Sequence, residues 1–250
     1  MGCFGQTKKS KLNDNISTSG GKELTQEITP SNNKHLIQNL KELSLLSKSD
    51  NYETIKKEIE AERSQLTSKE ITLDSTSKIF QKSLVNKIIP FWEGTKWTFE
   101  GHTSKPKIGS IACGYFVSTT LLDIGLNLNK YKLAQQSPIN EAKSLAVNSP
   151  MKMFAEESVS ANIAAINQYL KEGIHFIGFD ESHVGYILKE KNQLYLIHSN
   201  YIDAMGVTIE PIENSGVFAS YNRFYIAELS TNNSLLNYWT NNTLIEILSE

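Results

Sequence analysis

Residues 108–126 have the sequence IGSIACGYFVSTTLLDIGL, in which Cys113 stands where a loop of small residues meets a helical pattern. The pattern predicts a helix from about Cys113 to Ile124, ended by Gly125 in the usual way for a helix C-terminus. At a helix N-terminus the free amide groups and the helix dipole favour a thiolate over a thiol. Cys113 is therefore a candidate nucleophile, and it needs an imidazole to accept its proton and to protonate the leaving group.

The chain after this helix changes its hydrophobic period. Residues 158–173 predict a helix capped by Ser158 or Ser160 and closed by Gly173. From there the period is two, which is typical of strands. The expected strands cover 175–179, 183–189, 193–200, 206–212 and 223–229. Because residues 189–193, KEKNQ, form a turn, the second and third strands should be antiparallel neighbours.

The chain before Cys113 carries helical patterns. Apolar spacing predicts helices at 35–46, 51–66 and 71–89. The second is mostly charged and is expected to face solvent, and Pro90 is expected to end the third. Two further stretches, 90–110 and 126–157, show no regular period and are expected to be irregular.

The order of these elements predicts the fold class. Helices first and an antiparallel sheet afterwards indicate an α+β fold, with helices packed on an antiparallel sheet. A chain of 250 residues suits one domain plus an appendage. The expected organisation is a disordered leader, an N-terminal helical appendage, a catalytic domain and a C-terminal tail. These four parts cover residues 1–34, 35–69, 70–235 and 236–250.

Composition excludes several classes of function. A net charge of −2 gives no basic surface, which argues against a nucleic-acid partner. The chain has only two cysteines, Cys3 and Cys113, so it has neither a disulfide framework nor the usual ligands for zinc. No apolar run is long enough to span a bilayer. No metal or cofactor is expected.

The N-terminal residues allow two interpretations. The start, MGCFGQTKKSKLND, has no apolar segment of the kind found in signal peptides, and Gln6 stands where a myristoylation motif has Ser or Thr. In one interpretation Met-Gly precedes Cys3, the first residue of a cell-envelope lipoprotein, and residues 4–34 are its tether. Membrane contact would then be only through a lipid on Cys3. In the other, the segment is a cytoplasmic tail with an incidental cysteine.

Two histidines on the expected strands are candidate partners of the thiol. His183 lies in SHVGYIL and His198 in LYLIHSN. Side chains alternate along a strand, so His198 shares a face with Asn200, and His183 shares a face with Gly185. If both strands present these faces to the same side, the histidines reach the end of the Cys113 helix. Gly185 leaves room there for a neighbouring helix or a ligand. Either His198 or Asn200 can orient His183.

Three segments together resemble a known family. These are GTKWTFEGHTSKPKIGSIACGYFV (94–117), SHVGYIL (182–188) and LYLIHSN (194–200). They are similar to NlpC-type cell-wall peptidases, a papain-like family of cysteine peptidases and amidases, and the resemblance covers roughly residues 90–200. It implies a papain-like domain in which Cys113 is the nucleophile, His183 the base and His198 the orienting residue. It also implies an amide bond in peptidoglycan stem peptides as substrate.

The chain departs from the family pattern around the nucleophile. Ala112 stands where an aspartate is usual, and Gly114 and Tyr115 follow where Ser-Gly is usual. Trp97 replaces a tyrosine whose hydroxyl lies near the thiol in the family. His183 follows Cys113 by more residues than in compact members of the family. Residues 158–173 and the loop before them therefore look like an insertion that could cover the cleft.

Other side chains have both a functional and a structural interpretation. Trp97 is expected either to wall the cleft or to belong to the core, and His102 either to touch substrate or to be a solvated loop residue. Asn200 is a further candidate substrate contact, and His175, in an apolar strand, is expected to be structural. The backbone N–H of Cys113 is the expected oxyanion donor. Two other functions stay open: an acyltransferase or lipid amidase, and a non-catalytic binding module.

Overall fold

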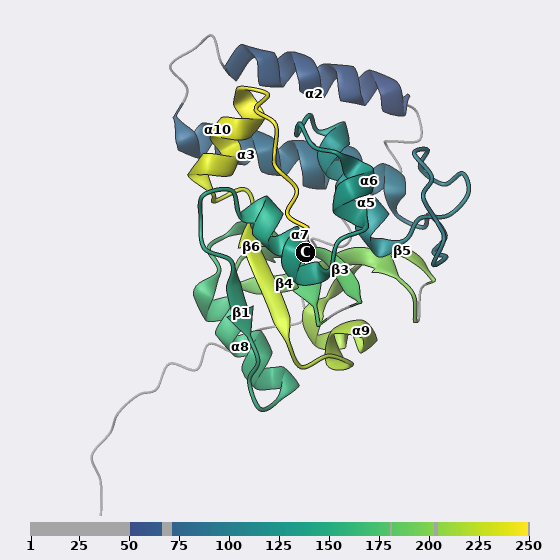
Figure 1. Ribbon diagram of the computed structural model, residues 1–250, viewed down its shortest axis with the longest axis vertical. Coiled ribbons are helices and arrows are strands. Elements are labelled where there is room, and N and C mark those ends of the chain that lie inside the picture. The colour runs from purple at the N-terminus through teal and green to yellow at the C-terminus, as the bar shows by residue number, and fades with distance from the viewer. Residues whose placement is uncertain (1–50, 67–71, 181, 203–204, 250) are drawn as a thin grey trace, which may run out of the picture. The chain divides into compact units, whose positions relative to one another are not determined.

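The structure is a computed structural model that describes residues 51–66, 72–180, 182–202 and 205–249 (Figure 1). The leader, the helix expected at 35–46, Cys3 and Glu181 lie outside these residues. In the described ranges no helix has both the length and the apolar character needed to cross a membrane.

Six antiparallel strands form one sheet in the order β1-β6-β2-β3-β4-β5. The strands are β1 (Lys152–Phe154), β2 (Gly173–Phe179), β3 (His183–Glu190), β4 (Gln193–Asn200), β5 (Gly206–Pro211) and β6 (Phe224–Glu228). All five strands predicted from the alternating pattern are present, and β3 and β4 are antiparallel neighbours as expected. Lys191 and Asn192 connect them with positive φ angles of 51° and 62°, which suits a tight hairpin turn.

Helices cover both faces of this sheet. They are α2 (Tyr52–Leu66), α3 (Leu73–Gln81), the π-helical η1 (Lys82–Ile88), α4 (Ile89–Trp92), α5 (Cys113–Asp123), α6 (Lys130–Ala134), α7 (Pro138–Ala146), α8 (Val159–Tyr169), the 3-10 turn η2 (Ile212–Asn214), α9 (Gly216–Ala219) and α10 (Asn233–Thr240). The predicted α+β class, with helices packed on an antiparallel sheet and N-terminal helices present, is confirmed.

The two faces of the sheet bury separate apolar clusters. Phe176, Tyr186 and Ile197 face the larger layer, which includes α2, α3, α5, α7 and α10. Ile187 and Leu196, one residue out of phase, face the smaller layer of α8, η2 and α9. This alternation is what a sheet with both faces covered requires, because successive side chains point to opposite sides. This second face is the α8 face of the sheet.

The prediction that Pro90 ends a helix was wrong. The chain stays helical from α3 through η1 and α4 to Trp92. In η1 the backbone N–H of Ile89 bonds the carbonyl of Leu84, five residues back, so the hydrogen-bond ladder shifts just before the proline. Pro90 then occupies the first turn of α4, where no backbone N–H is needed. The helix therefore carries Trp92 into the core, where its indole N–H donates to the Tyr52 hydroxyl at 2.7 Å.

The helix expected to face solvent is packed instead. In α2, Ile59, Arg63 and Leu66 are buried at i, i+4 and i+7, a narrow stripe among many charged residues. Nη1 of Arg63 donates to the carbonyl of Trp239 in α10 at 2.8 Å. Tyr52 at the start of α2 donates to a carboxylate oxygen of Asp123 at the end of α5, at 2.6 Å. The N-terminal helix thus belongs to the same packed layer as the Cys113 helix.

The stretch expected to be irregular, 126–157, contains α6, α7 and β1. Short helices give weak periodic signals, and α7 starts with Pro138 at its first turn, a position that proline favours. Gly173 does not close α8: it begins β2, while Leu170 ends the helix. In the C-terminal segment, α10 buries Trp239 in the core against Phe80 of α3, with ring centroids 5.1 Å apart.

Candidate active site

Cys113 is the first residue of α5, as the sequence predicts. Ala112 before it is extended and has no side chain able to cap the helix, so the first amide groups of α5 are not satisfied by a capping side chain. The backbone N–H groups of Val184, Gly114 and Cys113 itself are directed at the sulfur instead. The thiol is partly exposed and lines a cavity.

The thiol meets β3 where the ladder between β3 and β4 ends. The pairing of β3 with β4 ends at Tyr186 and Ile197, whereas β4 continues to pair with β5 as far as Asn200. The segment leading to Cys113 packs on β4 there, because Ser199 donates its hydroxyl to the carbonyl of Ile111 at 2.7 Å. The N-terminus of α5 lies beside the first residues of β3, since the backbone N–H of Val184 is directed at the sulfur.

The histidines share one face, as the alternation predicts. His183 and His198 point to the α8 face, on which the rings lie 5.1 Å apart at an interplanar angle of 83°. The expectation for Gly185 was wrong in its detail. A Cβ atom at Gly185 would lie 2.8 Å from the Cβ of His198, so the missing side chain makes room for the neighbouring strand's histidine, not for a helix or a ligand.

A chain of three polar side chains runs away from the cavity. Nε2 of His183 lies 2.8 Å from Nδ1 of His198, and Nε2 of His198 lies 3.1 Å from Oε1 of Glu210 in β5. Both imidazoles are buried, with His183 1% and His198 0% exposed. Nothing in the sequence analysis singled out Glu210. The alternation in 206–212 would place it on one face with Thr208, but local sequence does not show that β5 pairs with β4.

Of the other predicted site residues, Trp97, His102 and Asn200, only Trp97 lines the cavity. Trp97 lines the cavity, and its ring lies 5.8 Å from that of Tyr201. His102 is exposed, its Nδ1 lies 2.8 Å from the carbonyl oxygen of Glu100, and it is not among the residues that line this cavity. Asn200 is buried and accepts the backbone N–H of Ile202 at 2.8 Å, so its side-chain oxygen supports the turn after β4.

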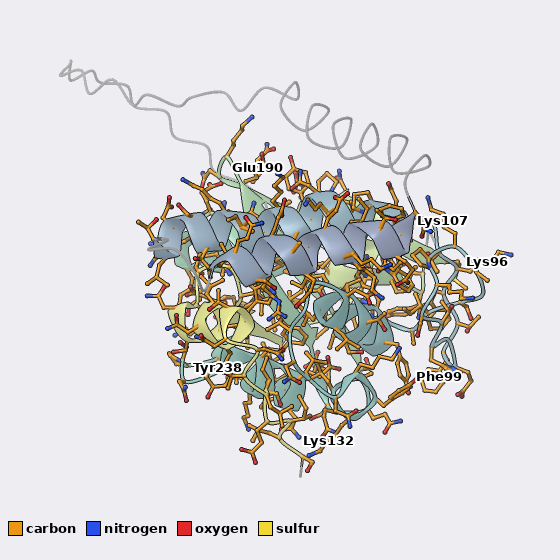
Figure 2. The ribbon with its side chains drawn as sticks, turned by 90° about the horizontal axis from the view of Figure 1, so that it is seen from above. Lys96, Phe99, Lys107, Lys132, Glu190 and Tyr238 are labelled. Atoms are coloured by element: carbon orange, nitrogen blue, oxygen red, sulfur yellow. The ribbon has the colours of Figure 1, made fainter. Side chains whose placement is uncertain are left out.

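The cavity has a volume of about 580 Å³ and lies between α5, the start of β3 and the α6–α7 segment. Its aromatic lining comes from Trp97, Phe99, Tyr115, Tyr201 and Tyr221. Phe99 is 80% exposed at the rim, and Figure 2 shows it on the same edge of the molecule as Lys96 and Lys107.

Of the insertion expected to cover the cleft, the stretch before residues 158–173 lines the cavity, and the helix does not. Residues 158–173 form α8 and the start of β2, and α8 packs on the α8 face without lining the cavity. The wall is built by the end of α6 and by α7, through Ala134, Gln135, Gln136, Pro138 and Glu141. The carbonyl of Ala134 approaches Gly114 so closely that a Cβ there would lie 2.7 Å from its oxygen. Gly114 therefore allows this wall to pack against the start of α5.

A tyrosine does lie near the thiol, although Trp97 replaces the one in the family pattern. The ring of Tyr201 lies 5.2 Å from that of His183, and its hydroxyl lies 2.8 Å from the Tyr221 hydroxyl. Tyr221 in turn lies 2.9 Å from the Ser182 hydroxyl. Burial raises the pKa of Tyr201, and the neighbouring Cys113 adds to this. Sequence analysis missed Tyr201 because it follows β4 in a turn with no motif around it.

Burial favours the neutral forms of both Cys113 and His183. Burial raises the pKa of the Cys113 thiol to about 11, although the N–H of Val184 opposes the shift. Burial also lowers the pKa of His183 well below its usual range. The expected thiolate is therefore not the resting form, because desolvation outweighs the amide groups at the start of α5. The cavity is therefore lined by a protonated thiol and a neutral imidazole.

Glu141 is a buried acid that also lines the cavity. The residue is 2% exposed, burial raises its pKa well above the usual range, and Oε2 has no hydrogen-bond partner among the described residues. Within the same residues, no three His, Cys, Asp or Glu side chains are grouped so that they could hold a metal ion.

Comparisons with known proteins add no relative: no family model matches the chain, and neither a curated protein nor a solved structure matches it significantly. What the chain does must therefore be argued from the geometry of this cavity.

Proposed function

We propose that this protein is a papain-like cysteine hydrolase that cleaves an amide bond, with Cys113 as nucleophile, His183 as general base and acid, and His198 as the orienting residue. One observation carries the proposal. A single cavity brings together a thiol at a helix N-terminus and an imidazole whose other nitrogen is bonded to a second histidine. Nucleophile, base and orienting group in this relation are the parts that covalent acyl transfer needs.

The chemistry starts from the neutral pair. As the sulfur of Cys113 attacks the amide carbonyl carbon, its proton passes to Nδ1 of His183, the nitrogen that is not bonded to His198. The backbone N–H of Cys113 donates to the developing oxyanion. The His183 imidazolium then protonates the leaving amine, and a thioester remains on Cys113. Water, deprotonated by His183, attacks the thioester, and the acid leaves as the thiol regains its proton.

The lining of the cavity favours one class of amide. Among the described residues that line it there is no lysine or arginine, while Glu100 is present together with five aromatic rings. Such a lining suits a neutral or amine-bearing substrate better than one whose anionic group would lie near the Glu100 carboxylate. Peptidoglycan stem peptides are the substrate that the resemblance to NlpC-type enzymes suggests. Such a substrate agrees with the cell-envelope interpretation of Cys3.

A second candidate function is a binding module that has kept a papain-like domain without catalysis. The observation that favours it is the raised pKa of Cys113, because a thiol that stays protonated is a weak nucleophile. The two candidates differ in whether the thiol reacts once a substrate fills the cavity.

Incubation with purified muropeptides, followed by mass spectrometry of the products, tests the proposal. The enzyme is expected to release fragments shortened at an amide bond, and Cys113→Ala to release none while keeping the melting temperature of the parent. Intact muropeptides with the parent protein, together with their retention on a column of Cys113→Ala, would instead establish the binding module. Cleavage by Cys113→Ala at the parent rate would refute the mechanism.

A further inference from the structure

We propose that Glu210 is a positioning residue that fixes the tautomers of both histidines, so that Nδ1 of His183 is free to accept the thiol proton. This inference rests on the proposed function, because it states which nitrogen of His183 accepts the proton in that mechanism. Glu210 touches neither the thiol nor the cavity lining and acts through His198.

The direction of the hydrogen bonds follows from what each group can donate. An ionised carboxylate only accepts hydrogen bonds. Glu210 is held in that form: burial acts to raise its pKa, but hydrogen bonds from His198 and Ser215 outweigh burial and lower it. Oε1 of Glu210 therefore accepts a hydrogen from Nε2 of His198, 3.1 Å away.

The next bond is then determined. Burial lowers the pKa of His198, so its ring is neutral and carries one N–H. If that hydrogen is on Nε2, Nδ1 carries only a lone pair and must accept. The hydrogen in the 2.8 Å contact therefore comes from Nε2 of His183. His183 is neutral too, so its Nδ1 carries the lone pair that takes up the proton of Cys113.

The opposite arrangement is unfavourable at both contacts. A hydrogen on Nδ1 of His198 would leave the lone pair of Nε2 facing the Glu210 carboxylate, two acceptors 3.1 Å apart. It would also make Nε2 of His183 an acceptor and put the hydrogen on Nδ1, where it blocks proton transfer. Both imidazoles are almost fully buried, and in surroundings of low dielectric such a mismatch is not relieved by water.

Substitution of Glu210 by glutamine should reverse the direction of these two hydrogen bonds. The side chain keeps its shape, but its amide can donate to Nε2 of His198, which then becomes the acceptor. His198 would carry its hydrogen on Nδ1 and His183 on its own Nδ1. The hydrolysis rate should fall roughly 10³-fold, because an imidazole in the wrong tautomer cannot accept the nucleophile's proton. Glu210→Asp should recover part of that loss. Glu213→Gln, an exposed neighbour on η2, is the matched control and should leave the rate unchanged.

Nitrogen-15 NMR of the imidazoles measures the tautomers without relying on turnover. The spectra are recorded on Cys113→Ala with Glu210, with Glu210→Gln and with Glu213→Gln. We expect a hydrogen on Nε2 of both His183 and His198 with Glu210 and with the control, and on Nδ1 of both with Glu210→Gln. A hydrogen on Nδ1 of either histidine with Glu210 in place would overturn the inference, even if the glutamine variant does not fold. Unchanged tautomers in a folded Glu210→Gln protein would also overturn it. Tautomers that reverse in a protein that cleaves no amide would support the role of Glu210 and refute the proposed function instead.

Discussion

His175 and His183 lie on neighbouring strands, on the same face of the sheet, and burial lowers the pKa of both. The two histidines differ in what their ring nitrogens contact. Nε2 of His175 lies 3.0 Å from the carbonyl oxygen of Lys171, and its Nδ1 is buried without a partner among the described residues. Nε2 of His183 is held by His198, and the ring lines a cavity that contains a thiol. Burial and a shifted pKa therefore do not mark an active site by themselves. What distinguishes His183 is its place in the lining of a cavity that also contains the Cys113 thiol.

The largest expected difference is in catalysis. His183→Gln should lower the amide hydrolysis rate by about 10⁴-fold, because the proposed mechanism moves the proton of Cys113 through the His183 imidazole. His175→Gln should change the rate by less than about 3-fold, since it lies outside the cavity. Steady-state kinetics with the same muropeptides measure both. Equal losses in the two variants would remove the distinction between these histidines.

The reactivity of the thiol should follow its raised pKa. With Cys3→Ser to leave a single thiol, alkylation of Cys113 by iodoacetamide should be slow at pH 7. It should accelerate roughly 10-fold per pH unit up to about pH 10, because the pKa is about 11 and only the thiolate reacts. His175→Gln should leave this profile unchanged. A rate that is already constant between pH 6 and 8 would show a preformed thiolate and contradict the neutral pair.

Stability should depend on pH through His175. Its pKa is about 4 in the folded protein and near 6.5 when unfolded, so the unfolded chain binds the proton more readily below pH 6.5. The stability that the neutral ring contributes is present above pH 6.5 and is lost as the pH falls towards 4. From pH 7 to pH 5 this histidine should cost about 2 kcal/mol of unfolding free energy.

His175→Leu removes this titration and is the variant to compare. Its unfolding free energy, measured with urea at both pH values, should fall by about 2 kcal/mol less than that of the parent. His183 and His198 remain in both proteins and titrate in the same direction, so they cancel in the comparison. The same pH dependence in His175→Leu and in the parent would show that His175 is not the group responsible.

The smallest expected effect is at Tyr201, which packs on His183, whereas no aromatic ring among the described residues packs on His175 in this way. Tyr201→Phe keeps the ring, 5.2 Å from His183, and removes the hydroxyl bonded to Tyr221. Loss of one such hydrogen bond is worth about 1 kcal/mol, or roughly 5-fold in kcat/KM. An unchanged kcat/KM would show that the hydroxyl contributes only to packing.

The sequence could predict features that depend on local periodicity, but not those that depend on the pairing of distant strands. The helix at Cys113 and the strands of His183 and His198 follow from periods of 3.6 and 2, and the structure has them at the expected places. Glu210 could not be found in this way, because its contact with His198 depends on the pairing of β5 with β4. The wall formed by α7 was missed because that helix is short and buries polar residues such as Glu141 in place of an apolar stripe.

The central claim is that Cys113 forms a thioester with the acyl part of an amide substrate. Acid-quenched mixtures of the protein with muropeptides, analysed by intact-protein mass spectrometry and peptide mapping, test it most directly. The account predicts an added acyl mass on Cys113 in the parent protein and in His175→Gln, and none in Cys113→Ala or His183→Gln. Cleavage of the substrate by Cys113→Ala, or an acyl group found on any residue other than Cys113, would contradict it.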